Sequence, residues 1–234
     1  MFNTIREDLL SLLAEKGAKL IGIADLSGIV QGELNTGIAV AVPIPKKIVK
    51  DLQTAPTKEY YDAYYALNEK LDEIVSCGAL FLQKCGYKAY ANTTKVVKTD
   101  EDWCTRLPHK TVATRAGLGW IGKNCLLVTE KYGCAVRLSS LLTNALLPAD
   151  RAINESRCGG CTVCVRNCPA KALTGTLWNI DTKREELFRK EDCYKTQMER
   201  MKQAVGIETD LCGLCFAVCP YTQKYLRTEQ RTYD

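Results

Sequence analysis

Cysteines with regular spacing dominate the last third of the chain. The segment CGGCTVCVRNCPAKAL, from Cys158 to Leu173, has the spacing C-x2-C-x2-C-x3-C-P. Two-residue gaps let a tight loop direct three thiolates toward one small iron–sulfide cube, whereas the fourth cysteine lies one residue further along and is directed elsewhere. A second motif, CGLCFAVCPY, runs from Cys212 to Tyr221. The two motifs together are typical of two 4Fe–4S clusters that take ligands from both.

This spacing predicts two sets of four ligands. The first cluster is expected to bind Cys158, Cys161, Cys164 and Cys219. The second is expected to bind Cys168, Cys212, Cys215 and Cys193, the last from the intervening segment KEDCYKTQ. Reciprocal donation would place the clusters side by side, close enough for electron transfer.

A zinc site is the alternative, although structural zinc sites usually show two CxxC pairs with a spacer.

Composition supports metal-bound thiolates in a reducing compartment. The 234 residues include 13 cysteines, an odd number, and the N-terminus MFNTIREDLLSLLAEKG has the pattern of an amphipathic helix instead of an export signal. We therefore predict a cytoplasmic protein. The sequence contains no run of 18 apolar residues, so a membrane span is not expected. The formal charge is +5, and two oxidised clusters with their thiolates would reduce it to about +1, which is a weak argument for nucleic-acid binding.

Periodicity before the cysteines predicts alternating helices and strands. Apolar residues recur at helical spacing near the N-terminus and again over residues 57–84, and the runs KLIGIADL, GIAVAVPIP and YKAYAN are typical of strands. A short helix is expected at 111–115 and a β-hairpin over 125–144, with EKYG as its turn. The predicted fold class is α+β, with an N-terminal α/β mixed-sheet domain, residues 1–150, followed by a ferredoxin-like double-cluster domain, residues 151–234.

A glycine-rich segment, RAGLGWIGKN, lies just before this predicted hairpin. Its glycines, Gly117, Gly119 and Gly122, leave little side-chain bulk, so a flat or bulky ligand could approach the backbone closely. Lys123 and Asn124 add a charge and an amide.

Clusters move single electrons, and the organic chemistry usually belongs to another cofactor or a partner. About 150 residues precede the clusters, more than a simple electron carrier needs.

The segments AGLGWIGKN, RLSSLLTN and the two cysteine motifs, with DCY between them, occur in this order along the chain. In this combination the chain resembles the epoxyqueuosine reductase family, which is cobalamin-dependent and distantly similar to reductive dehalogenases. The resemblance is firm from about residue 107 to residue 221 and loose over the first hundred residues.

The resemblance implies a base-off cobalamin that receives electrons through the clusters and reduces a substrate. In the family this reaction removes the epoxide oxygen of epoxyqueuosine and gives queuosine in tRNA. The positions that match the corrinoid-proximal segments of the family are Gly117, Leu118, Gly119, Trp120, Gly122, Lys123, Asn124 and Thr143.

The chain departs from the family where an acidic proton donor is expected. The stretch DWCTRLPHKT occupies that place, and it makes Asp102 and His109 the candidate catalytic residues. His109 is the single histidine of the chain, and an ordinary histidine pKa would suit proton transfer near neutrality.

Three functions remain open from the sequence. A cobalamin-dependent iron–sulfur reductase is favoured, with a small-molecule or modified-nucleoside substrate and an electron donor of the flavodoxin or ferredoxin type. A ferredoxin-like accessory protein with clusters alone is the second. A tRNA-binding or sensor module is the third, but no basic stripe is evident, and the helical-repeat extension that many family members use for tRNA does not follow the cysteines.

Overall fold

The computed structural model describes residues 2–101 and 103–228. They form helices and antiparallel strand pairs, so the predicted α+β class is confirmed. The chain divides into two compact units, each assembled from separate segments. Unit 1 comprises Met1–Pro43, Tyr64–Trp120 and Arg137–Asn154, and unit 2 comprises Ile44–Ala63, Ile121–Val136 and Glu155–Asp234. The domain boundary expected at residue 150 stays a prediction.

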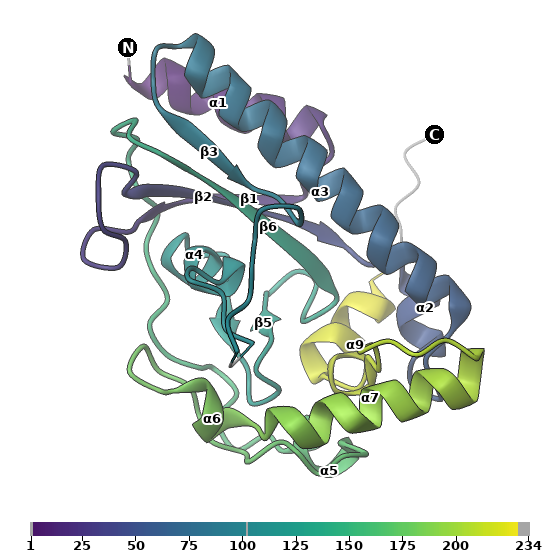
Figure 1. Ribbon diagram of the computed structural model, residues 1–234. Helices are drawn as coiled ribbons and strands as arrows, with labels where there is room; N and C mark the ends of the chain where they lie inside the picture. Colours follow the sequence, from purple (N-terminus) through teal and green to yellow (C-terminus); the bar gives the residue numbers. More distant parts are fainter. Residues whose placement is uncertain (1, 102, 229–234) are drawn as a thin grey trace. The chain divides into compact units, whose positions relative to one another are not determined.

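Unit 1 is built on a four-stranded sheet with the order β1-β2-β6-β3 (Figure 1). These strands are β1 (Leu20–Asp25), β2 (Thr36–Pro43), β6 (Val136–Thr143) and β3 (Ala89–Asn92). The pairs β1–β2 and β3–β6 are antiparallel, with Ile23 opposite Ile38 and Ala91 opposite Leu141. β1, β2 and β3 coincide with the strand-like runs of the sequence.

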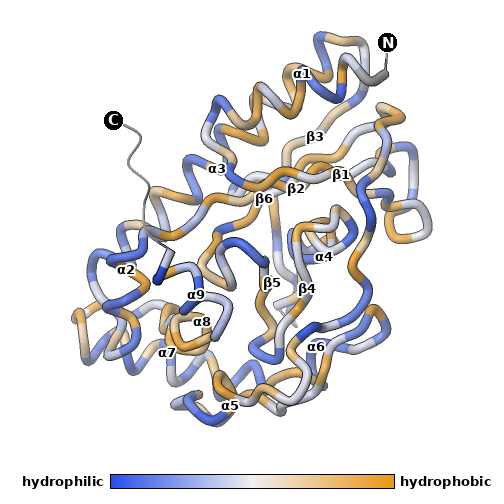
Figure 2. The backbone as a smooth tube through the Cα atoms, turned by 180° about the vertical axis from the view of Figure 1, so that it is seen from behind, coloured by the Kyte–Doolittle hydropathy of each residue, from blue (hydrophilic) through white to orange (hydrophobic). Residues whose placement is uncertain are grey.

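Two amphipathic helices cover one face of this sheet. α1 (Phe2–Glu15) and α3 (Lys58–Lys84) lie on the same side of the strands in Figures 1 and 2. Their apolar residues, spaced three or four apart, pack against alternate residues of the strands. The buried cluster includes Leu9, Leu13, Ile23, Ile38, Val40, Leu71, Ile74, Val75, Leu82 and Leu141.

Small residues occupy the opposite face of β1 and β2, where α4 (His109–Arg115) packs. A Cβ atom added to Gly22 would collide with the backbone carbonyl oxygen of Ala116. One added to Gly37 would lie 2.7 Å from a Leu26 methyl carbon and 2.8 Å from a Val112 methyl carbon. The two glycines therefore set how closely α4, and the glycine-rich segment after it, approach the sheet.

Unit 2 contains short helices joined by cysteine-bearing loops. Its helices are α2 (Lys46–Asp51), α5 (Val163–Asn167), α6 (Arg184–Leu187), α7 (Lys190–Val205), α8 (Leu214–Ala217) and α9 (Pro220–Arg227). Contacts join α5 to α8, and join α9 to both α2 and α8. Within residues 2–101 and 103–228, no helix is long and apolar enough to span a membrane.

The predicted β-hairpin over 125–144 is wrong. β5 (Leu127–Val128) pairs with β4 (Trp120–Ile121), and β6 instead joins the sheet of unit 1. The turn itself forms, because Thr129 and Gly133 exchange both backbone hydrogen bonds at 2.9 and 3.0 Å. The two flanking runs are β-rich, but their hydrogen-bonding partners are distant in sequence, and local patterning does not reveal such partners.

We predict that Gly22→Ala destabilises the protein by about 1–3 kcal/mol, the usual cost of forcing an extra methyl group into a packed region. The free energy of unfolding from chemical denaturation, followed by circular dichroism, measures the effect. Gly160→Ala is the matched control, because its added Cβ has no atom within 4 Å and its φ is not positive. Equal stability of the two variants would contradict the packing role of Gly22.

Candidate functional site

The first predicted set of cysteines lies together around Cys164. Burial raises the pKa of the Cys164 thiol to about 11, and negative charge on Cys219, Cys158 and Cys161 contributes to that rise. Such repulsion between like charges requires short separations. The four sulfurs that the sequence assigned to the first cluster are therefore neighbours in unit 2.

The second predicted set is brought together in the same way. Burial raises the pKa of the Cys193 thiol to about 11 and that of Cys215 well above its ordinary value, and Cys168 and Cys212 act on both. Cys164 of the first set also acts on Cys215, so the two sets adjoin. The assignment of each sulfur to one cluster stays a prediction.

The chemistry of these donors suits iron–sulfur clusters. Each thiolate of a 4Fe–4S cluster binds a separate iron of the cube, whereas the ligands of a zinc ion converge on one point. The thiols are soft donors, and every one of the eight is at least partly shielded from solvent.

The proline after Cys219 explains how the second motif presents its last sulfur. Pro220 is the first residue of α9, where its missing N–H and fixed φ cost nothing. The hydrogen bond with Cys134 is the main cause that lowers the pKa of the Cys219 thiol, and the backbone N–H groups of Thr222 and Tyr221, which point back to its sulfur, lower it further. The start of α9 therefore stabilises Cys219 as a thiolate, which is the form that binds iron.

Two further buried cysteines lie beside these sets and were not singled out by the sequence. Cys134 forms a hydrogen bond with Cys219, and its Sγ accepts another from the Asn124 amide at 3.3 Å. Cys125, at a positive φ of 59°, contributes to the raised pKa of Cys193. Neither cysteine has a spacing typical of a ligand, so only the fold reveals their proximity to the two motifs.

Two glycines of the segment AGLGWIGKN, Gly117 and Gly122, are accounted for by packing within the protein. Gly117 has a positive φ of 69°, and an added Cβ would lie 2.6 Å from the backbone oxygen of Arg151. An added Cβ at Gly122 would lie 2.7 Å from a Val128 methyl carbon and 2.8 Å from the Asn124 side-chain oxygen. Gly119 and Trp120 are buried, and Leu118 is half-buried. Packing within the protein therefore requires glycine at positions 117 and 122, with or without a bound ligand.

Lys123 and Asn124 direct their side chains toward the cysteine loops. Lys123 is buried, and its Nζ donates a hydrogen bond to the Gly159 carbonyl oxygen at 2.8 Å. The Asn124 amide donates to Cys134 Sγ and, at 3.5 Å, to the Cys215 carbonyl oxygen. Both side chains therefore connect the glycine-rich segment to the cysteine motifs within unit 2.

Thr143 lies at the end of β6 in unit 1 and is fully buried. Its hydroxyl donates a hydrogen bond to the Lys88 carbonyl oxygen at 2.7 Å and accepts one from the Ala145 backbone N–H at 3.1 Å. The hydroxyl thus stabilises the strand end.

His109 begins α4, and the prediction that it titrates near neutrality is wrong. Burial, with a further contribution from the positive charge of Arg137 and an opposing effect of Asp72, lowers the pKa of its imidazole to about 4. Its Nδ1 lies 2.9 Å from the hydroxyl oxygen of Ser140 on β6, which also accepts a hydrogen bond from Asn92. At pH 7 this histidine is neutral and fixed against the sheet. The other candidate, Asp102, lies outside the described residues.

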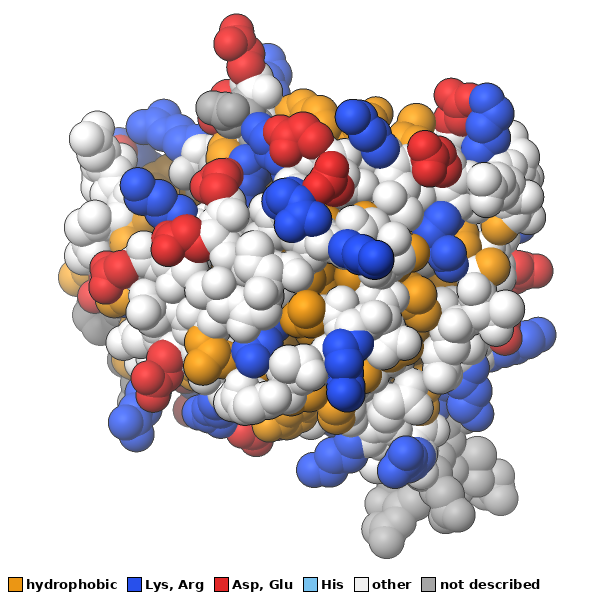
Figure 3. Space-filling model, turned by 90° about the horizontal axis from the view of Figure 1, so that it is seen from below, with side chains coloured by type: hydrophobic (Ala, Val, Ile, Leu, Met, Phe, Trp, Pro, Cys, Tyr) orange, Lys and Arg blue, Asp and Glu red, His pale blue; other side chains and the backbone are white. Residues whose placement is uncertain are grey.

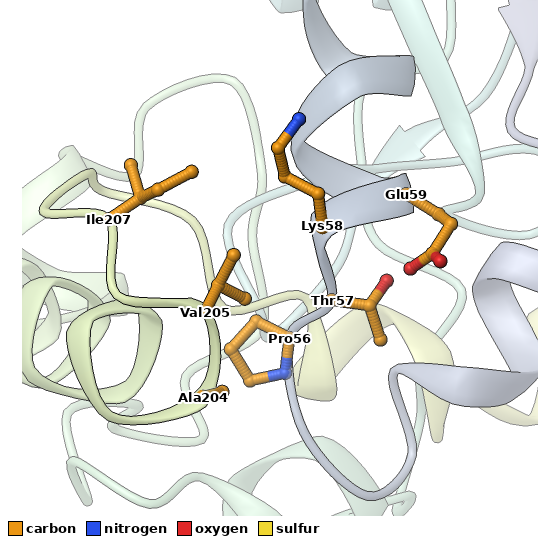
Figure 4. A pocket seen from close by; sticks show the side chains of 7 residues that line it. All are labelled: Pro56, Thr57, Lys58, Glu59, Ala204, Val205 and Ile207. Carbon is orange, nitrogen blue, oxygen red and sulfur yellow. The ribbon is translucent and has the colours of Figure 1, made fainter.

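A hollow of about 510 Å³ lies elsewhere in unit 2. Figure 4 shows that it is bounded by the start of α3 and the end of α7. None of the sequence-predicted site residues lines it; the lining residues are Pro56, Thr57, Lys58, Glu59, Ala204, Val205 and Ile207.

Comparison with known proteins agrees with the cysteine geometry. Residues 157–222 match the family model described as a 4Fe-4S double cluster binding domain. An epoxyqueuosine reductase of Bacillus cereus is 36% identical over 119 residues, covering 49% of this chain and 29% of that protein. This chain is similar to the epoxyqueuosine reductases. The matched family model places a double 4Fe–4S cluster domain in the C-terminal part of the chain.

Solved structures extend the similarity of fold over nearly the whole chain. A crystal structure of epoxyqueuosine reductase with an epoxyqueuosine-modified tRNA stem loop matches with a TM-score of 0.62 and 22% identity, covering 95% of this chain and 66% of that one. A reductive dehalogenase structure, described with a mechanism for B12-dependent dehalogenation, matches with a TM-score of 0.72 and 17% identity, covering 92% and 31%. The chain spans less than a third of the length of the Bacillus cereus relative.

We predict that the imidazole of His109 stays neutral from pH 8 down to about pH 5. NMR of protein with ¹³C-labelled histidine measures this directly, since the single histidine gives an unambiguous ring signal. The folded-state pKa of about 4 lies below the ordinary 6.5. The neutral ring thus contributes stability above pH 6.5, and this contribution is lost as the pH falls toward 4. In His109→Asn, which cannot titrate, this loss should be absent. A ring titration near pH 6.5 would contradict the buried, neutral assignment.

Proposed function

We propose that this chain is a reductase in which two 4Fe–4S clusters pass electrons to a cobalamin that reduces a substrate. The grouping of the eight cysteines carries the proposal. Cys164 has Cys219 among its neighbours, and Cys215 has Cys168, so each set combines sulfurs from both motifs. Two adjoining clusters form a path for single electrons. A two-electron reduction needs such a path, because its electrons are delivered one at a time.

The cluster assignment completes this proposal. The first cluster takes Cys158, Cys161, Cys164 and Cys219, and the second takes Cys168, Cys193, Cys212 and Cys215. Gln197 donates a hydrogen bond to Cys193 Sγ at 3.0 Å, and Asn124 lies close to the carbonyl oxygen of Cys215. Such contacts around the sulfurs orient the ligands and adjust the potentials of the clusters.

Cobalamin is proposed from the similarity to epoxyqueuosine reductases and to a dehalogenase described as B12-dependent. When bound, it would supply a cobalt centre that accepts single electrons and reacts with the substrate. The polar side-chain atoms of Lys123, Asn124 and Thr143 already have protein partners. What the glycine-rich segment can offer a corrinoid is therefore its backbone and the half-buried Leu118.

The proposed substrate is a modified nucleoside or another small molecule with a reducible group. Removal of an epoxide oxygen as water consumes two electrons and two protons. Neutral His109 is a poor source of those protons at pH 7, because its pKa is about 4. We therefore favour Asp102 as the proton donor.

The proposed electron donor is a small flavodoxin- or ferredoxin-type protein. The epoxyqueuosine reductase solved with a tRNA stem loop makes a nucleoside within tRNA one candidate substrate. On the face drawn in Figure 3, Lys and Arg side chains are spread among Asp and Glu side chains and do not form one stripe.

Anaerobic purification followed by metal analysis tests the proposal. We predict about eight irons and about eight sulfides per chain, and about one cobalt after incubation with cobalamin and removal of the excess. Full iron with no retained cobalt would leave the cluster domain intact and contradict the reductase in favour of a cluster-only electron carrier. About four irons would contradict the double-cluster assignment itself.

Single substitutions test how the motifs share ligands. We predict that Cys168→Ala and Cys212→Ala, from different motifs, each lose the same cluster and reduce the iron to about four per chain. Cys85→Ala is the control, because Cys85 is exposed and distant in sequence from the motifs. Electron paramagnetic resonance of the reduced variants identifies the cluster that remains. Loss of different clusters in the two variants would contradict the interleaved ligand sets.

A further inference from the structure

Cys134 is a buried thiol that lies directly against one of the predicted cluster ligands. It is not among the eight predicted ligands, and only 4% of its surface is exposed. A hydrogen bond joins its side chain to Cys219. On its other side, the Asn124 amide donates a hydrogen bond to Cys134 Sγ at 3.3 Å. Asn124, Cys134 and Cys219 thus form a continuous chain of side-chain hydrogen bonds.

The backbone holds Cys134 firmly in this place. The preceding Gly133 has a positive φ of 57°, and a Cβ added there would collide with the backbone of Thr222. The Cys134 backbone N–H donates to the Thr222 hydroxyl at 3.0 Å. The rings of Tyr132 and Tyr225 pack edge to face, with centroids 5.2 Å apart. Cys134 and the two residues before it are therefore attached to α9, the helix that follows Cys219.

The direction of the hydrogen bonds follows from the groups around Cys219. The backbone N–H groups of Tyr221 and Thr222 donate to its sulfur, so this sulfur is stabilised as an acceptor. An iron-bound Cys219 sulfur carries no proton, so in the hydrogen bond between the two cysteines the S–H of Cys134 is the donor. The Asn124 amide N–H in turn donates to Cys134 Sγ. A donated hydrogen bond polarises a thiol and strengthens its own donation to the next group. The chain of donors ends on the Cys219 sulfur.

We propose that Asn124 and Cys134 are positioning residues that raise the reduction potential of the cluster bound through Cys219. This inference rests on the proposed function, because it requires Cys219 to be a cluster ligand. Reduction adds negative charge to the cluster and its sulfurs, and donors directed at a ligand sulfur stabilise that added charge. A more positive potential makes this cluster easier to reduce than it would be without these donors.

The test is a redox titration of the anaerobically purified holoprotein, followed by electron paramagnetic resonance. Cys134→Ala should lower the potential of the Cys219-bound cluster and leave the other unchanged. Cys134→Ser retains an O–H donor and should restore most of the potential. Asn124→Ala should produce a smaller shift in the same direction as Cys134→Ala, because Asn124 acts through Cys134.

Gln197→Ala is the matched control. It removes the hydrogen bond to Cys193, a predicted ligand of the other cluster, so it should lower that cluster's potential alone. Unchanged potentials in Cys134→Ala at full iron content would overturn the inference. Loss of half the iron in Cys134→Ala would also overturn it, because Cys134 would then be a ligand. Wild-type protein with about four irons would instead contradict the proposed function.

Discussion

The structure of unit 2 depends on one constraint: the sulfurs of two cysteine motifs that are distant in sequence must lie together. Cys219 lies near Cys164 of the first motif, and Cys168 lies near Cys215 of the second. In the proposed assignment, each cluster therefore takes ligands from both motifs. The short helices α5 and α8 contact each other, and each of the two lies within one motif. The start of α9 completes the arrangement, because its first backbone N–H groups point to Cys219.

Elements outside the motifs support this arrangement. The turn at Gly133 approaches Thr222 so closely that a side chain cannot be accommodated. Lys123 binds the carbonyl oxygen of Gly159 in the first motif, and Asn124 lies against Cys215 in the second. The end of the glycine-rich segment therefore contacts both motifs, and a sequence feature that suggested a ligand site also has a structural role in the cluster domain.

Much of this could be predicted from the sequence because the signals are local. The gaps between Cys158, Cys161 and Cys164 are fixed by the shape of the cube, and the helical spacing over 57–84 matches α3 closely. The α+β class and the double-cluster domain followed from such patterns and were confirmed.

The remainder depends on contacts between residues distant in sequence. Tertiary packing decides that β5 pairs with β4 and not with β6. The neutral state of His109 arises from burial against Ser140 and from the charge of Arg137, neither of which is adjacent in sequence. The proximity of Cys134 to Cys219 likewise has no counterpart in cysteine spacing.

The central claim is that the two ligand sets interleave, which requires the clusters to be immediate neighbours. Electron paramagnetic resonance of the fully reduced wild-type protein tests it most directly, because two paramagnetic clusters at short range split and broaden each other's signals. The account predicts a complex, interacting spectrum that simplifies to a single uncoupled signal when only one cluster is reduced. Two independent, unbroadened signals in the fully reduced protein would contradict it.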